Sequence, residues 1–235
     1  VGETVYAIGT EQTDSESCSY SGYAAAPGPA DLYDEYQVAR FWKSDDGGVT
    51  WSDETDEVIS ADNMPDLQDD GEGWNDIMFF TAVAVAPDDP DFVVVTGWGF
   101  EDVNTGEGDT PSEDFENYLP VVVASTDGAG DFDYVACQPI SGYITCVDVS
   151  VEVDGDHEIA VGTWTPNNND QFANGGVADY DTSDAGTVWR FSGGSWSSTW
   201  VDTSAYDGWA PVDAVIDLEF SPNFDVDDTI MAVCI

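Results

Sequence analysis

Apolar and polar residues alternate in short segments along this chain, and the segments come in pairs joined by Asp-rich turns. Alternation over about four to eight residues is typical of a β-strand. The same strand pair recurs at a spacing of about 64 to 71 residues, which indicates a repeat architecture. The three copies occupy 82–87 with 92–97, 146–150 with 158–163, and 216–222 with 229–233. The chain is therefore predicted to be all-β, and residues 4–10 match only the second strand of the pair.

A second kind of hairpin lies between these copies, and its clearest example follows the strand-like segment 37–42. Its turn has the pattern S-x-D-x-G-x-T-W, filled by Ser44, Asp46, Gly48, Thr50 and Trp51. Ser44 and Asp46 can accept hydrogen bonds from backbone N–H groups of a tight turn, and Gly48 can take the positive φ that such a turn requires. Trp51 is predicted to begin the return strand and to pack beside the turn.

The hairpin recurs twice with fewer matching positions. Residues 121–132 keep Ser125 and Asp127, and residues 187–196 keep the strand, a Gly turn and an aromatic residue. Hairpins of this kind alternate with the strand pairs, which predicts four-stranded antiparallel blades that bury both faces only when they are stacked. The predicted blades span 1–60 (partial), 80–137, 144–203 and 214–235 (partial), within one region that covers 1–235.

Residues 44–51 match every fixed position of one Asp-box. The chain therefore resembles the Asp-box (BNR-repeat) β-propellers, a broad group that includes sialidases, sortilin-like ectodomains and several glycoside hydrolase families. This resemblance implies a β-propeller-like array with Asp-box hairpins. Closed propellers have about four to eight blades, so the chain is expected to be part of a longer propeller. The box is a structural turn on a fold that hosts many activities, so it predicts architecture and not chemistry.

The charge balance is extreme, with 49 acidic residues against three basic ones and a formal net charge of −46. Nucleic acid and anionic membrane surfaces are not expected as partners, because no basic stripe can neutralise their phosphates. Such a charge opposes compaction unless it is screened or neutralised. Salt shortens the Debye length from about 8 Å at physiological ionic strength to about 3 Å at 1 M, so saline surroundings are one expectation.

Bound Ca²⁺ is a second way to neutralise the carboxylates, and the Asp-rich turns of the strand pairs are its candidate sites. Closely spaced carboxylates and turn carbonyls are the oxygen ligands that a hard cation takes. Aspartate is also a favoured turn residue in its own right, so both interpretations stay open. The candidate ligands are Asp88, Asp89, Asp91, Asp154, Asp156, Asp225, Asp227 and Asp228.

The inventory of catalytic groups favours no enzyme class. Related sialidases hold the substrate carboxylate with three arginines, and this chain has two, Arg40 and Arg190. Glycoside hydrolysis needs two positioned carboxylates, but no pair stands out among 49 acidic residues. His157 is the single histidine and lies in an Asp-rich turn without a neighbouring nucleophile. No catalytic residue is therefore predicted.

Long connections follow the second strand of each blade, at 11–36, 98–119 and 164–185. Loops of this length are often functional, and all three leave the blades at the same point, which predicts one binding face. Candidate ligand contacts on that face are Trp98, Trp164 and Tyr180. The two tryptophans hold matching positions after the second strand, which also favours packing within or between blades.

Four cysteines without a CxxC spacing favour disulfides in an oxidising compartment over a zinc site. A bond between Cys137 and Cys146 is predicted at the junction of two blades. The width of a four-stranded blade, at about 4.8 Å per strand, opposes this pairing unless the connection doubles back. The alternative pairing joins Cys18 to Cys234.

Together these features favour an extracellular, non-catalytic propeller with a structural or adhesive role in a cell-surface layer, sheath or similar assembly. Its partners would be other protein subunits. The alternative is a carbohydrate-binding or glycoside-hydrolase propeller whose long-loop face takes a polysaccharide. No membrane span is expected, because the chain has no apolar run of about 18 residues.

Overall fold

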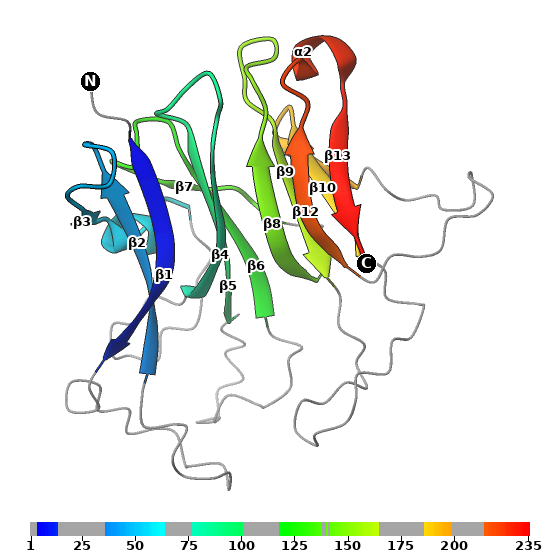
Figure 1. The fold of residues 1–235 in the computed structure, drawn as a ribbon. Coiled ribbons are helices and arrows are strands. Elements are labelled where there is room, and N and C mark those ends of the chain that lie inside the picture. The colour runs from blue at the N-terminus through cyan, green and yellow to red at the C-terminus, as the bar shows by residue number, and fades with distance from the viewer. Residues whose placement is uncertain are drawn as a thin grey trace, which may run out of the picture.

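The strands form four antiparallel sheets that stand side by side (Figure 1). In this computed structural model the described residues are 4–13, 36–63, 77–100, 118–137, 140, 142–164, 186–198 and 214–235. Two of the sheets have four strands each, and in both of them neighbours in the sheet are neighbours in the sequence. The prediction of an all-β, propeller-like array of four-stranded antiparallel blades is confirmed.

We number the sheets as blades 1 to 4 along the chain. Blade 1 contains β1 (Val5–Thr13), β2 (Tyr36–Ser44) and β3 (Ser52–Asp53). Blade 2 contains β4 (Ile77–Val85), β5 (Val93–Phe100), β6 (Tyr118–Ser125) and β7 (Asp133–Tyr134). Blade 3 contains β8 (Tyr143–Val149), β9 (Ile159–Trp164), β10 (Val188–Ser192) and β11 (Ser195–Ser198). Blade 4 contains β12 (Val215–Phe220) and β13 (Ile230–Cys234). Two short helices are present among the described residues. The first, α1 (Thr55–Ile59), follows β3, and the second, α2 (Phe224–Asp227), lies between β12 and β13.

The repeated strand pairs open blades 2, 3 and 4, and each closes its turn with the same backbone hydrogen bond. The donors Ala86, Ser150 and Ser221 bond the carbonyls of Phe92, Glu158 and Thr229, respectively. This shared bond aligns the three blades residue by residue. Residues two places after each acceptor are therefore equivalent across the array.

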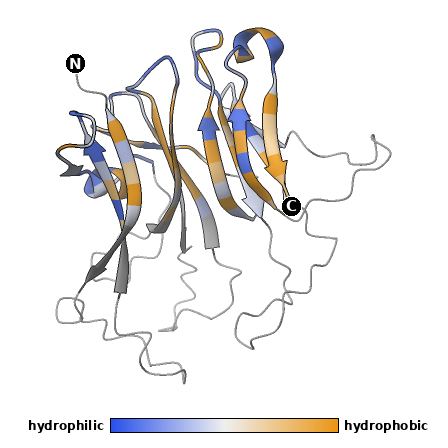
Figure 2. Cartoon of the chain, viewed as in Figure 1, coloured by the Kyte–Doolittle hydropathy of each residue, from blue (hydrophilic) through white to orange (hydrophobic). Residues whose placement is uncertain are grey.

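The hydrophobic core lies between successive blades. Along β5, Val93 and Val95 belong to the cluster against blade 1, whereas Val94 belongs to the cluster against blade 3. Because neighbouring blades cover both faces of this strand, apolar residues occupy consecutive positions and not only alternate ones. Each fully buried aliphatic side chain stabilises the fold by about 1.5–3 kcal/mol. Figure 2 shows the resulting hydrophobic bands along the strands of the inner blades.

Blade 4 approaches blade 3 closely at Gly162 of β9. A Cβ added to this glycine would lie 2.6 Å from both Cys146 Sγ and Val215 Cγ1, so any larger residue would force the blades apart. The backbone N–H of Phe220 on β12 donates to Asp148 on β8 at 2.7 Å. Close packing and a polar contact thus occur at one blade boundary.

The predicted disulfide between Cys137 and Cys146 is not formed, because the two residues lie on opposite faces of the third blade. Cys137 is a free thiol in the cluster between blades 2 and 3. Cys146 is a free thiol in the cluster between blades 3 and 4. Of the alternative pair, Cys234 is also free, and Cys18 lies outside the described residues.

Candidate functional site

The turn between β2 and β3 is closed by one serine and one aspartate. The hydroxyl of Ser44 accepts the N–H of Gly48 at 2.8 Å and donates to Oδ1 of Asp46 at 2.9 Å. That Oδ1 also accepts the N–H groups of Val49 at 3.0 Å and Thr50 at 2.8 Å, and Oδ2 accepts the Thr50 hydroxyl at 2.7 Å. Gly48 has a φ of +88°, which a residue without Cβ adopts at little cost. The turn therefore has the hydrogen bonding that its sequence predicts.

The turn between β6 and β7 repeats this arrangement. Ser125 accepts the N–H of Ala129 at 3.0 Å and donates to Oδ1 of Asp127 at 2.9 Å. The same oxygen accepts the N–H of Gly130 at 2.9 Å. Ala129 takes the glycine position of the first turn with a φ of +69°. Its buried methyl group joins the cluster between blades 1 and 2, and this packing holds the unfavourable backbone conformation in place.

Both turn aspartates are held in the ionised form by these hydrogen bonds. The Thr50 N–H, the Thr50 hydroxyl and Ser44, in that order, lower the pKa of the exposed Asp46 to about 2. The Ser125 hydroxyl is the main group that lowers the pKa of Asp127. A general acid or base is most effective with a pKa near the working pH. These two carboxylates are therefore built to close turns.

An aromatic residue follows the corresponding turn in each of blades 1, 2 and 3. In blades 2 and 3 this residue packs against the preceding blade. Phe132 is 1% exposed and packs edge-on against Phe41 of blade 1, with ring centroids 5.8 Å apart. Trp196 is buried in the cluster between blades 2 and 3. Trp51 holds this position in blade 1 but is 45% exposed, and its indole N–H donates to the carbonyl of Gly48 at 3.0 Å. Trp51 therefore lies beside its turn, on a face that no described blade covers.

The turn between β4 and β5 contacts the corresponding turn of blade 3 through His157, whose side chain is largely buried. Its Nδ1 lies 3.0 Å from the carbonyl oxygen of Ser150 and 3.8 Å from Asp88 Oδ1. Its Nε2 lies 3.9 Å from Asp89 Oδ2. Asp88 Oδ2 also accepts the N–H of Glu152 at 3.0 Å. The single histidine is therefore part of the joint between blades 2 and 3, and not an isolated turn residue.

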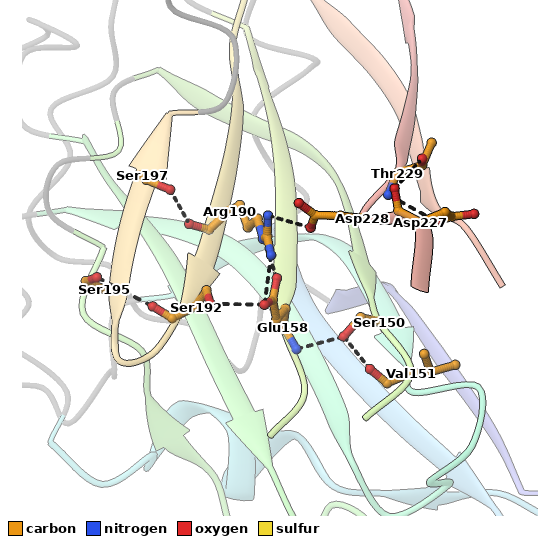
Figure 3. Close-up of polar contacts among 10 residues, drawn as sticks. All are labelled: Ser150, Val151, Glu158, Arg190, Ser192, Ser195, Ser197, Asp227, Asp228 and Thr229. Carbon is orange, nitrogen blue, oxygen red and sulfur yellow. Dashed lines mark hydrogen bonds and ion pairs between the residues drawn. The ribbon is translucent and has the colours of Figure 1, made fainter. Parts of the chain in front are cut away.

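A charged network joins blade 3 to blade 4, as Figure 3 shows. Glu158, buried just before β9, accepts hydrogen bonds from Nε of Arg190, from its Nη2 at 2.9 Å and from the hydroxyl of Ser192 at 3.0 Å. Nη1 of Arg190 lies 3.0 Å from Asp228 Oδ1 in the turn after α2. The guanidinium carbon lies 5.0 Å from the centre of the Phe224 ring. Hydrogen bonding to Glu158 is the main cause that raises the pKa of Arg190.

Sequence reasoning did not find the pair formed by Glu158 and Arg190. The two residues are 32 positions apart and become neighbours only when β9 and β10 pair. The scarcity of basic residues was a signal that each would have an acidic partner. With 49 acidic residues in the chain, the sequence does not indicate which one.

Other predicted calcium ligands accept hydrogen bonds inside their own turns. Asp227 accepts the Ser221 hydroxyl at 2.7 Å and the Thr229 N–H at 3.2 Å. Asp89 accepts the N–H of Asp91 at 3.0 Å. These contacts are the Asx-type bonds for which aspartate is favoured in turns.

The remaining candidate ligands lie at exposed positions of the same turns. Asp154, Asp156, Asp225 and Asp228 are exposed, and φ is +55° at Asp154 and +48° at Asp228. Within the described ranges, no group of three or more His, Cys, Asp or Glu side chains could hold a metal ion. The geometry supports the turn interpretation, and Ca²⁺ binding stays a prediction.

The three candidate residues of the long-loop face are placed to different extents. Trp164 ends β9, opposite Tyr143, and the two rings lie 5.8 Å apart. For Trp98 the structure describes the backbone, which pairs with Pro120 on β6. Tyr180 lies outside the described residues. Trp164 therefore packs against Tyr143 within its own blade, in line with the packing interpretation. A contact between Trp164 and a ligand stays a prediction.

None of the residues that the structure describes belongs to a helix long and apolar enough to cross a membrane. No family model matches the chain, and no curated protein matches it. Among solved structures, the chain is similar to one described as "YCF48 bound to D1 peptide", with a TM-score of 0.37 and 16% sequence identity. This similarity covers 80% of the present chain and 41% of the YCF48 chain, so the chain spans less than half of that protein's length.

Proposed function

We propose that this chain belongs to an extracellular, non-catalytic β-propeller protein with a structural or adhesive role in a cell-surface layer or sheath. The observation that carries the proposal is how the polar side chains are used. Ser44 and Asp46 close a turn, Glu158 and Arg190 hold adjacent strands, and Asp228 ties blade 4 to blade 3. In a catalytic site such groups converge on a position for substrate. Among the residues that the structure describes, these groups bond one another.

The distribution of the aspartates supports the same role. The turns between β4 and β5, β8 and β9, and β12 and β13 lie at one end of the array (Figure 1), and each exposes carboxylates. With a net charge of −46, a surface of this kind remains hydrated in concentrated salt and attracts divalent cations. Saline or calcium-containing surroundings would therefore favour the folded state, and the partners would be other protein subunits.

Localisation tests this proposal directly. Antibodies against the chain should label intact cells of its source, and brief protease treatment of those cells should remove the label. Recovery of the protein from the cell interior alone would contradict the proposal.

The competing function is binding or cleavage of polysaccharide. Calorimetric titration with oligosaccharides of several classes, combined with assays of reducing ends, separates the two. We expect no turnover and no saturable binding. Hydrolysis of a polysaccharide that is lost with a single carboxylate substitution would establish an enzyme instead.

A further inference from the structure

The turn between β8 and β9 carries an exposed Asp–Gly pair, formed by Asp154 and Gly155. Two backbone hydrogen bonds between Val153 and Asp156, at 2.8 and 3.1 Å, close the turn around this pair. Both central residues have a positive φ, +55° at Asp154 and +98° at Gly155. The turn lies at the end of the array where the turns of the other strand pairs also lie (Figure 1).

An aspartate that is followed by glycine can isomerise without an enzyme, because no Cβ shields the glycine nitrogen. This nitrogen bonds to Cγ of the aspartate, and a carboxylate oxygen leaves as water with the amide proton and one proton from solvent. Water then opens the resulting five-membered succinimide. Opening at Cγ restores aspartate, whereas opening at the backbone carbonyl gives isoaspartate, whose main chain runs through Cβ and Cγ. Water is the sole co-reactant, and nothing is oxidised or reduced.

The described residues contain three Asp–Gly pairs, and hydrogen bonds restrain two of them. Both carboxylate oxygens of Asp46 accept hydrogen bonds, at 2.7–3.0 Å. Oδ1 of Asp127 accepts three, at 2.9–3.0 Å. The nitrogen of Gly128, which would attack Asp127, donates its proton to the carbonyl of Asp91 at 2.9 Å. These bonds must break before Cγ and the glycine nitrogen can meet.

The third pair has no such restraint. The side chain of Asp154 makes no hydrogen bond or ion pair within the part of the chain that the structure describes. The N–H of Gly155 likewise donates to no described group. Apart from its chain neighbours, no atom lies within 4 Å of the position that a Cβ on Gly155 would take. The carboxylate and the nitrogen are therefore free to approach each other.

We infer that Asp154 is the site of spontaneous isomerisation in the folded chain and that isoaspartate there weakens the joints of blade 3. Isoaspartate adds one methylene to the main chain of a two-residue turn. His157, which lies against blade 2, and Glu158, which bonds Arg190, follow this turn directly. Arg190 in turn reaches Asp228 of blade 4. The modification goes beyond the proposed structural role and does not depend on it.

Incubation in heavy-oxygen water tests the inference, since each opening of a succinimide adds one heavy oxygen atom to the residue. The chain is kept folded in about 1 M NaCl, below its unfolding temperature, and is then digested and mapped by mass spectrometry. Isoaspartate is counted separately with a methyltransferase that recognises it. Heavy oxygen and isoaspartate should accumulate several-fold faster at Asp154 than at Asp46 and Asp127. Equal rates at the three residues in the folded chain would overturn the assignment.

The chain unfolded in denaturant is the matched control. Asp46, Asp127 and Asp154 are then the same dipeptide without restraint, so all three should incorporate heavy oxygen at similar rates. A preference for Asp154 that persists in the unfolded chain would show that the hydrogen bonds do not protect the other two.

Two substitutions test the chemistry at the turn, and thermal unfolding checks that each variant is folded. Asp154→Glu keeps the charge but requires a six-membered ring, which forms slowly, so labelling at this position should be lost. Asp154→Asn should convert faster than the wild type, because ammonia leaves an amide more readily than water leaves a carboxylate. Labelling that survives in Asp154→Glu, or an Asp154→Asn variant that converts no faster, would refute the succinimide.

The effect on the blade joints is measured on the aged wild-type chain. Ion exchange separates the isoaspartate form from the unmodified form, and the isoaspartate form should unfold at a lower temperature. Equal unfolding temperatures would refute the link between this turn and the joints of blade 3. The localisation experiment does not involve this residue, so failure of the inference leaves the proposed function standing.

Discussion

Asp148 on β8 accepts the backbone N–H of Phe220 on β12 at 2.7 Å, across the boundary between blades 3 and 4. The bond satisfies a backbone donor of one blade with a side chain of the next. Burial raises the pKa of Asp148, and the hydrogen bond from Phe220 opposes that effect without cancelling it. The carboxylate therefore joins the blades at an electrostatic cost.

This cost predicts that Asp148→Asn stabilises the protein at neutral pH. A carboxyl group whose pKa is higher in the folded state binds protons on folding, so its unfavourable contribution develops as the pH rises above the ordinary value of 3.8. The amide oxygen of asparagine still accepts the N–H of Phe220. Thermal unfolding at several pH values should show a gain at pH 7 that disappears below about pH 4. A variant that is less stable at pH 7 would contradict this account.

Asp46 should behave in the opposite way. Its pKa is lowered to about 2 by the bonds of the turn, so its contribution to stability is present above the ordinary pKa and is lost as the pH falls through about 2. Asp46→Ala should lower the unfolding temperature at pH 7 more than Asp46→Asn, because asparagine keeps one acceptor oxygen. Between pH 4 and 2, the difference between wild type and Asp46→Asn should shrink. Equal unfolding temperatures at pH 7 for all three proteins would show that the turn does not depend on this carboxylate.

Removal of the charge of Arg190 should lower the free energy of unfolding far more than removal of an exposed charge. Arg190→Met leaves the buried Glu158 without its partner, and such a loss costs about 3 kcal/mol. Lys43→Met is the matched control, since Lys43 pairs at 3.3 Å with the exposed Asp45 and surface pairs contribute about 0–1 kcal/mol. Chemical denaturation of both variants measures the difference. Similar losses in the two would refute the role assigned to the network.

Packing between blades predicts unequal effects at equivalent aromatic positions. Phe132→Ala removes a ring buried against Phe41 and should cost about 3–5 kcal/mol. Trp51→Ala should cost about 1 kcal/mol, because its ring is half exposed and makes one hydrogen bond within its turn. Denaturation of the Phe41→Ala, Phe132→Ala and double variants should give a coupling of about 0.5–1.5 kcal/mol. Additive losses would indicate that the two rings do not interact.

Ionic conditions should control stability through the net charge of −46. Dialysis into low salt with a chelator should lower the unfolding temperature sharply, because self-repulsion is then unscreened. Ca²⁺ added back at constant ionic strength should restore more stability than NaCl if the Asp-rich turns bind it. Recovery with NaCl alone would assign the whole effect to screening. Indifference to both would disprove the electrostatic argument.

The local sequence pattern predicted turns and strand pairs correctly where the contacts join residues close together in the chain. The bonds of Ser44 and Asp46, the positive φ of Gly48 and the pairing of β8 with β9 all follow from spacing and turn chemistry. The same reasoning failed for Cys137 and Cys146, which are close in sequence but lie on opposite faces of blade 3. Proximity along a chain does not tell which side of a sheet a residue faces at a blade boundary.

The sequence by itself determined the strands, their antiparallel pairs and the turns between them, because these depend on the alternation of side chains and on contacts of short range. Only the tertiary structure decided what each blade places against the next. Arg190 of blade 3 pairs with Asp228 of blade 4, and His157 of blade 3 lies near Asp88 and Asp89 of blade 2. Trp51 is exposed at the position where Phe132 is buried. Such contacts join residues whose spacing in the sequence follows no regular repeat, so they form only when the sheets stack.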